Sequence, residues 1–147
     1  MEIVEYSEEY KKSVFEFTER CFEELGKKFE PDGRHSFYND IADEFDVFYC
    51  VLEDKRVTGT VGLKKFNTDS VELKALYLDK GLRGQGIGRK LMDKAVSAAK
   101  ELGYKSIVLD SMSKYKDARR LYERAGFKDT ERYNDNLHAD VFMRLEL

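Results

Sequence analysis

A glycine-rich segment, Arg83–Gly88, separates a run of residues typical of a β-strand from one typical of an α-helix. Before it, apolar and polar residues alternate in Val71–Leu78, and the run becomes apolar at its end, as in a partly buried strand. Gly103 lies where a left-handed residue would end the helix that follows the glycines. In that helix, apolar residues recur at steps of three and four: Ile87, Leu91, Ala95, Ala98 and Leu102. The glycines therefore lie at a strand-to-helix junction.

A junction of this kind favours binding of an anion. Glycine lets the backbone approach a ligand closely, and the unpaired N–H groups of the first helical turn point outward at the positive end of the helix dipole. We therefore predict that this turn binds phosphate.

Other interpretations of the glycines compete with this one. A glycine-rich turn can be no more than a turn. A P-loop is excluded, because no Gly-Lys-Ser/Thr follows. The dinucleotide fingerprint G-x-G-x-x-G is a closer alternative, since Asp110 follows about twenty residues later. However, Arg89 stands where that fingerprint needs its third glycine.

Arg83, Gly86 and Gly88 match the signature Arg/Gln-x-x-Gly-x-Gly/Ala, and on these residues the chain resembles the GNAT superfamily of N-acetyltransferases. Leu76-Tyr77-Leu78 upstream and Ala118–Phe127 downstream lie at the spacing expected for it. The resemblance covers roughly Val47 to the C-terminus. It implies an α/β (α+β) fold: a mixed central sheet of about six to seven strands, splayed between strands 4 and 5 and flanked by about four helices.

Composition limits the class of protein. A length of 147 residues predicts a single domain, 1–147. The net charge of −3 and the absence of a long basic run argue against a nucleic-acid partner. No apolar run approaches the roughly 20 residues that span a bilayer, and no secretory segment is present, so we expect a cytoplasmic protein without a membrane partner. Cys21 and Cys50 lack motif spacing and His35 and His138 stand alone, which predicts free thiols and no metal.

The remaining sequence predicts strands and helices in mixed order. A helix capped by Ser7 should end at Gly26, and a short helix is expected at Ser36–Phe45. Lys105–Asp110 should form a strand parallel to Val71–Leu78, connected through the intervening helix. Further strands are expected at Met1–Tyr6, Val47–Leu52, Val57–Phe66, Phe127–Arg132 and Val141–Leu147. Within the strand Val57–Phe66, two glycines predict bulging or close packing: Gly59 and Gly62.

The resemblance implies that acetyl-CoA, as co-substrate, lies between the fourth and fifth strands. Backbone groups of Leu76 and Leu78 would pair with the pantetheine arm and polarise the thioester carbonyl. Arg83 and Lys90 would add positive charge near the phosphates, together with the side chain of Arg89. The backbone amides that would hold the pyrophosphate belong to Gly84, Gln85, Gly86, Ile87, Gly88 and Arg89.

Two residues are the candidates for catalysis. Tyr122 matches the family tyrosine that hydrogen-bonds the coenzyme sulfur and protonates the leaving thiolate, although a tyrosine on a helical stripe is also an ordinary core residue. Glu72 occupies a position that some members use for a general base, with an outward residue of an alternating strand as the equal alternative. Asp110 is the second choice, and other members use no base. Many members place Asn one turn before Ala118, where this chain has Tyr115.

The acceptor would bind beside these residues. In this superfamily the region between the first two strands usually builds that side of the site, where an ordinary surface loop is the alternative. The candidates there are Phe29, Glu30, Asp32, His35 and Tyr38. Near the C-terminus, Tyr133, Asn134 and Asn136 are candidates for contacting the acceptor, or else turn formers between two strands.

Together these features predict an enzyme that moves an acetyl group from acetyl-CoA to a primary amine by direct attack in a ternary complex. The acceptor would be a small-molecule amine or a peptide amine, and the acidic Glu30 and Asp32 favour a cationic small molecule. The resemblance is compatible with a homodimer. Two alternatives stay open: a non-catalytic acyl-CoA-binding sensor on the same scaffold, and a reductase with a nucleotide cofactor.

Overall fold

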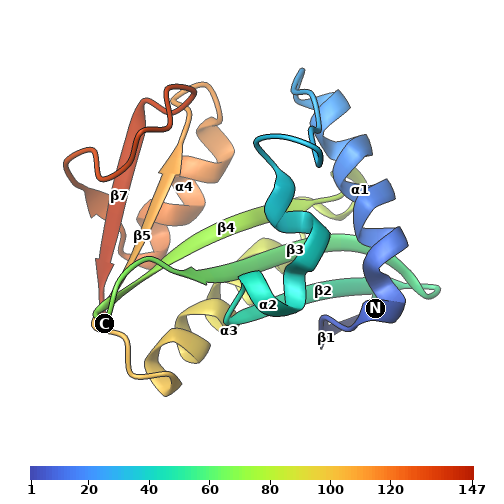
Figure 1. Ribbon diagram of the computed structural model, residues 1–147, viewed down its shortest axis with the longest axis horizontal. Coiled ribbons are helices and arrows are strands. Elements are labelled where there is room, and N and C mark those ends of the chain that lie inside the picture. Colours follow the sequence, from blue (N-terminus) through green and yellow to red (C-terminus); the bar gives the residue numbers. More distant parts are fainter.

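A mixed sheet of seven strands forms the centre of the computed structural model, which describes residues 1–147 (Figure 1). The order of the strands across the sheet is β1-β2-β3-β4-β5-β7-β6. The strands are β1 (Glu2–Glu5), β2 (Val47–Glu53), β3 (Arg56–Lys65), β4 (Ser70–Leu78), β5 (Ser106–Ser111), β6 (Lys128–Asp129) and β7 (Val141–Glu146). The helices are α1 (Lys11–Glu24), α2 (Ile41–Glu44), α3 (Ile87–Glu101) and α4 (Lys116–Ala125), with short 3-10 turns η1 (Glu8–Tyr10), η2 (Ser36–Asp40) and η3 (Lys80–Leu82).

The pairing of the strands divides the sheet at its middle. Strands β1 to β4 pair antiparallel in sequence order, whereas β4 and β5 pair parallel and are connected through α3. A parallel pair needs such a crossover because the chain must return to the end of the sheet at which the first strand begins before the second strand can run in the same direction. Beyond it, β7 pairs antiparallel with both β5 and β6. The predicted α/β fold with parallel fourth and fifth strands is confirmed.

Helices cover both faces of the sheet and bury a separate core on each. The helices α1 and α2 lie on one face, and α3 and α4 lie on the other (Figure 1). Alternation along β2 supplies both cores: Val51 packs with the residues of α3, and Cys50 and Leu52 pack with those of α1. The apolar stripe predicted on α3 is buried at Ile87, Leu91, Ala95 and Ala98. Its last member, Leu102, is 51% exposed, because it is the C-cap residue that follows the helix.

Glycines in β3 make room for neighbouring side chains, as their position predicted. A Cβ at Gly62 would lie 2.6 Å from a ring carbon of Phe45, and one at Gly59 would lie 2.9 Å from Leu78 and from Val51. Neither distance is compatible with a side chain, so these glycines allow close packing.

Three predicted elements differ from those observed. The helix at Ser36–Phe45 is instead η2 followed by the single turn α2. Ser7 donates to the carboxylate of Glu9 at 3.3 Å rather than capping a helix, so η1 precedes α1. The strand at Phe127–Arg132 shrinks to β6, and beyond it the guanidinium of Arg132 donates to backbone carbonyls of the following loop at 134, 136 and 139.

Neither cysteine forms a disulfide. Cys21 and Cys50 are buried free thiols, and burial raises the pKa of each to about 12. Such thiols stay protonated and are poor nucleophiles. No three His, Cys, Asp or Glu side chains are placed to hold a metal ion. None of the helices is long and apolar enough to cross a membrane.

Candidate active site

The glycine turn presents a row of unpaired backbone amides. Gly84 and Gly86 have left-handed φ angles of 78° and 79°, and Gly86 is the N-cap of α3. A Cβ on either would meet nothing within 4 Å, so their conformation, rather than lack of space, requires glycine. No backbone N–H from Gly84 to Arg89 donates a hydrogen bond within the chain, and the first bond of α3 runs from Lys90 N to Gly86 O at 3.1 Å. These donors lie at the positive end of a helix of 15 residues, an arrangement that favours phosphate.

The turn lies mostly at the surface: Gly84, Gln85, Gly86 and Arg89 are exposed, whereas Ile87 is buried. Gln85 donates from Nε2 to the carbonyl of Gly81 at 3.0 Å, which braces the turn. Arg89 pairs with Asp93 one helical turn later at 3.3 Å, and Arg83 is exposed without an ion-pair partner. The turn therefore carries positive charge that is free to meet an anion.

The strands β4 and β5 separate next to this turn. Their pairing covers three residue pairs, from Ser70 with Ser106 to Glu72 with Val108. Beyond that point Asp110 and Ser111 pair with β7, and the end of β4 pairs with β3. The two strands diverge accordingly in Figure 1.

A bulge marks the end of the shared pairing. Ala75 has a left-handed φ of 58°, and the register between β3 and β4 shifts between Thr60 and Gly62. The carbonyl of Ala75 is removed from the ladder and accepts instead a hydrogen bond from the hydroxyl of buried Thr60 at 2.6 Å. A bulge re-aims the residues that follow it. Here those residues are Leu76 and Leu78, whose half-buried side chains pack against the core shared with α3.

Tyr122 lies on α4 beside the opening. It is 7% exposed, and its ring packs at 6.1 Å from that of Phe127. Burial raises the pKa of Tyr122 to about 12; the hydroxyl of Ser111 opposes this shift and the charge of Asp110 adds to it. The phenol is therefore neutral at physiological pH and able to donate a proton or a hydrogen bond.

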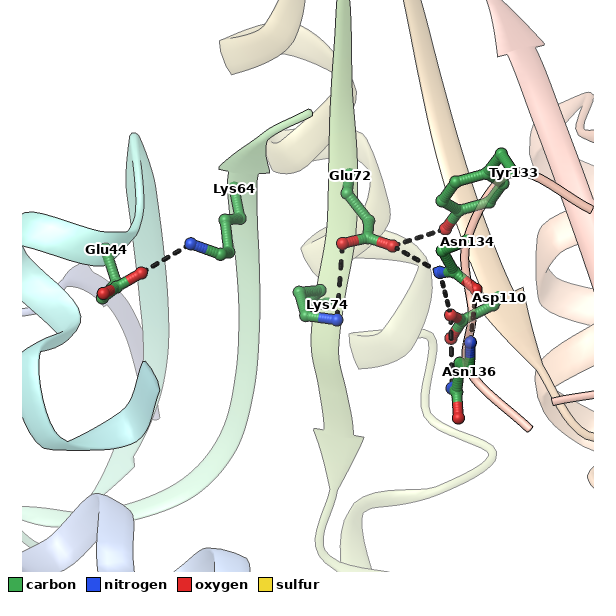
Figure 2. Close-up of polar contacts among 8 residues, drawn as sticks. All are labelled: Glu44, Lys64, Glu72, Lys74, Asp110, Tyr133, Asn134 and Asn136. Carbon is green, nitrogen blue, oxygen red and sulfur yellow. Dashed lines mark hydrogen bonds and ion pairs between the residues drawn. The ribbon is translucent and has the colours of Figure 1, made fainter. Parts of the chain in front are cut away.

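Glu72 is the centre of a polar network that connects β4 with the loop before β7 (Figure 2). Its carboxylate accepts a hydrogen bond from Tyr133 Oη at 2.6 Å and another from Asn134 Nδ2 at 3.4 Å, and it pairs with Lys74 Nζ at 3.4 Å. Burial, and then the charge of Glu72, raise the pKa of Tyr133 far above its ordinary value. Its hydroxyl therefore remains a donor. Because a carboxylate has about four acceptor positions, these contacts leave room for one more.

Asp110, at the end of β5, belongs to the same network. Its Oδ2 accepts a hydrogen bond from Asn134 Nδ2 at 2.7 Å and another from Asn136 Nδ2 at 3.3 Å (Figure 2). Asn134 thus contacts both Glu72 and Asp110, the two candidate bases, across the separation of β4 and β5. The structure brings together Glu72, Asp110, Tyr133 and Asn134 as a single cluster.

Phe29 and His35 lie in a different cluster, on the α1 side of the sheet. The ring of Phe22 packs edge-on against both, at 5.6 Å and 5.1 Å. His35 is 7% exposed, and its Nδ1 accepts the backbone N–H of Glu30 at 3.0 Å. Burial, with a smaller contribution from Arg34, lowers the pKa of His35 to about 4. The imidazole is therefore a neutral member of an aromatic core.

Sequence reasoning missed an important side chain in this region. Lys27 extends its Nζ among three aromatic rings, at 4.7 Å from the centre of Phe22, 5.5 Å from Tyr77 and 5.6 Å from Tyr115. Nζ also donates to Tyr77 Oη at 3.2 Å. Lys27 follows the end of a helix, where no periodicity predicts the direction of a side chain. Its position was therefore not visible in the sequence.

Comparisons with known proteins identify the family. The model of the acetyltransferase (GNAT) family matches residues 11–127. An uncharacterised N-acetyltransferase of Schizosaccharomyces pombe is 40% identical over 77 residues, which are 52% of this chain and 47% of that protein. Human N-acetyltransferase 8B is 33% identical over 88 residues, 56% of this chain and 39% of that protein. The matched region thus spans about half or less of the length of these relatives.

A solved structure matches the whole fold. It is an acetyltransferase of the GNAT family from Staphylococcus aureus Mu50, with a TM-score of 0.91 and 25% identity over 99% of this chain and 98% of that one. Members of this family use acetyl-CoA as the acetyl donor. The open amides of the glycine turn, the separated strands and these matches lead to one conclusion: the chain belongs to the GNAT family of acetyltransferases.

Proposed function

We propose that this protein transfers an acetyl group from acetyl-CoA to a primary amine, by direct attack of the amine in a ternary complex. The observation that carries the proposal is the row of unpaired amides from Gly84 to Arg89 beside the separation of β4 and β5. One end of the site suits a diphosphate, and the adjacent gap in the ladder leaves backbone groups free for an extended arm. The thioester of acetyl-CoA supplies the activated acetyl group.

In this proposal different residues bind the coenzyme, stabilise the oxyanion and protonate the leaving sulfur. The turn amides and Arg83 bind the diphosphate, and Leu76 and Leu78 present backbone groups to the arm after the bulge at Ala75. Fixed backbone dipoles stabilise the oxyanion that develops during acyl transfer, because they are oriented before the charge appears. Tyr122, neutral and buried, donates a proton to the departing sulfur.

Proton removal from the acceptor amine is assigned to Glu72, with Asp110 as the alternative. Both carboxylates belong to one network, and Asn134 contacts both. Tyr133 and Asn134 lie where an acceptor approaching Glu72 would meet them. Phe29 and His35 would act indirectly, by shaping the aromatic wall on the α1 side. The acceptor is a small-molecule or peptide amine.

The decisive experiment uses Tyr122→Phe. Removing one hydroxyl should lower kcat for thiol release from acetyl-CoA by about a hundredfold to ten-thousandfold, the usual contribution of a general acid. Binding of CoA, measured by calorimetry, should change little, because the ring remains. Equal rates for variant and wild type would refute the role of Tyr122. CoA binding without any turnover over a broad panel of amines would instead identify an acyl-CoA sensor.

A second pair of variants separates the candidate bases. Glu72→Gln should lower kcat with little change in CoA affinity, while Asp110→Asn should lower it less. The reverse ranking would transfer the role of base to Asp110. Equal and small effects would mean that the amine loses its proton to water.

A further inference from the structure

Lys27 is held rigidly at the end of α1. The N–H of Lys27 bonds to the carbonyl of Phe22 at 2.8 Å, and that of Gly26 to the carbonyl of Glu23 at 3.1 Å. With Gly26 at a φ of 70°, these two bonds form a Schellman motif. The backbone at Lys27 is therefore fixed, and its side chain starts from a defined position.

From there the side chain reaches across the separation of β4 and β5. Phe22 belongs to α1 and Tyr77 to β4, whereas Tyr115 is the N-cap of α4 and follows β5 in the chain. The Nζ atom therefore lies between groups from both sides of the opening. Its hydrogen-bond partner, Tyr77, is the residue between Leu76 and Leu78. The side chain of Tyr77 packs against the core on the α1 side, whereas those of Leu76 and Leu78 pack on the α3 side, so the amine of Lys27 lies on the α1 side of the strand to which the proposed function assigns the acyl arm.

The surroundings also make this amine more nucleophilic than a surface lysine. Burial is the main cause that lowers the pKa of Lys27 to about 8, and the cations Arg34, Lys114 and Lys74 add to the shift while Asp110 opposes it. Near neutral pH the fraction of free amine is therefore larger than on an ordinary lysine by a factor on the order of a hundred.

We propose that Lys27 is an acceptor carried by the chain itself, so that the protein acetylates its own Lys27 Nζ. This inference rests on the proposed function. The lone pair of Nζ forms a bond to the thioester carbonyl carbon, and the carbon–sulfur bond breaks. The sulfur leaves with its electron pair and takes a proton from Tyr122. The surplus proton on nitrogen passes to water, and Tyr122 regains its proton from water, so that no net proton is gained or lost. The products are an amide at Lys27 and free thiol, with no other reactant needed.

Acetylation would change the site in a definite way. The product amide carries no charge, so the cation–π attraction to Phe22, Tyr77 and Tyr115 disappears. The amide would remain beside the arm and occupy the place that an external amine has to enter. Acetylated protein should therefore turn over external acceptors more slowly than unmodified protein.

The test incubates the full chain with acetyl-CoA and no added acceptor, followed by peptide mass spectrometry. We expect one acetyl group, on Lys27, at a first-order rate that does not depend on protein concentration. The matched comparison is Lys28, the exposed neighbour in the same peptide, which should stay unmodified. Lys27→Arg keeps the positive charge and should abolish the modification. Chain unfolded in urea should lose the preference for Lys27.

Binding of CoA, measured separately by calorimetry, distinguishes the two possible failures. If CoA binds and Lys27 stays unmodified, or is modified no faster than Lys28, self-acetylation is refuted and the proposed function stands. If CoA does not bind, both self-acetylation and the proposed function are refuted. Modification whose rate rises with protein concentration would also refute the inference, because it would occur between molecules.

Discussion

Tyr133→Phe tests whether the loop before β7 is held by the network around Glu72. The substitution keeps the aromatic ring, which packs at 5.0 Å from Phe66 and 5.7 Å from Phe142. It removes one hydroxyl, and with it the 2.6 Å hydrogen bond from Tyr133 Oη to Glu72 Oε2. The experiment therefore isolates a single interaction.

The expected cost follows from the burial of the acceptor. The side chain of Glu72 is 11% exposed, and its other interactions, with Asn134 and Lys74, are both 3.4 Å long. A hydrogen bond to a charged group contributes about 1.5–3 kcal/mol. We expect Tyr133→Phe to lower the free energy of unfolding by about 2 kcal/mol, and Tm by about 4–8 °C.

The assay is urea unfolding with Tyr104→Phe as the matched control. Tyr104 also donates to a carboxylate, that of Asp46, but at the exposed surface, so the same substitution should cost less than about 1 kcal/mol there. A double-mutant cycle of Tyr133→Phe with Glu72→Gln should give a coupling energy of about 1–3 kcal/mol. If the two tyrosine variants are equally stable, or the coupling is near zero, the network does not hold the loop.

Other substitutions test the turn, the bulge and the aromatic core. Gly86→Ala should cost about 1–2 kcal/mol of stability and weaken CoA binding measured by calorimetry, whereas Gly88→Ala, inside α3, should be neutral or stabilise by up to about 1 kcal/mol. Thr60→Val should cost about 1–3 kcal/mol in urea unfolding, because the carbonyl of Ala75 loses its partner. Since the pKa of His35 falls to about 4 on folding, the unfolded chain binds more protons between about pH 4 and 6.5, and stability falls as pH drops through that window. His35→Gln should flatten this dependence between about pH 6.5 and 5, and an unchanged slope would show that His35 is not its source.

The fold was predictable because its determinants are local or periodic. Alternation along β4 and the stripe on α3 specify which faces are buried, and Gly26 and Gly103 end helices at the positions expected. The predicted bounds were less accurate for elements whose ends depend on contacts with distant parts of the chain. The loop after β6 is one example, because the interactions of Arg132 with later carbonyls have no sequence signal.

The site was predictable only in part. Glycine marks the turn at Gly84 and Gly86, since only that residue adopts its conformation readily. The bulge in β4 has no such marker, because an alanine, Ala75, adopts the left-handed conformation there. The aromatic enclosure of Lys27 also needs tertiary structure, since Phe22, Tyr77 and Tyr115 are far apart along the chain.

The short pairing between β4 and β5 has a mechanical consequence. Only three residue pairs join β4 to β5 at the centre of the sheet. The two halves of the sheet are therefore stiffer than the boundary between them, and local opening should concentrate at that boundary. A molecule that hydrogen-bonds to both halves replaces the absent hydrogen bonds between β4 and β5 and stiffens the whole sheet. This effect adds to the stabilisation that any ligand provides through mass action. The coenzyme of such a protein would therefore act as a removable structural part as well as a reactant.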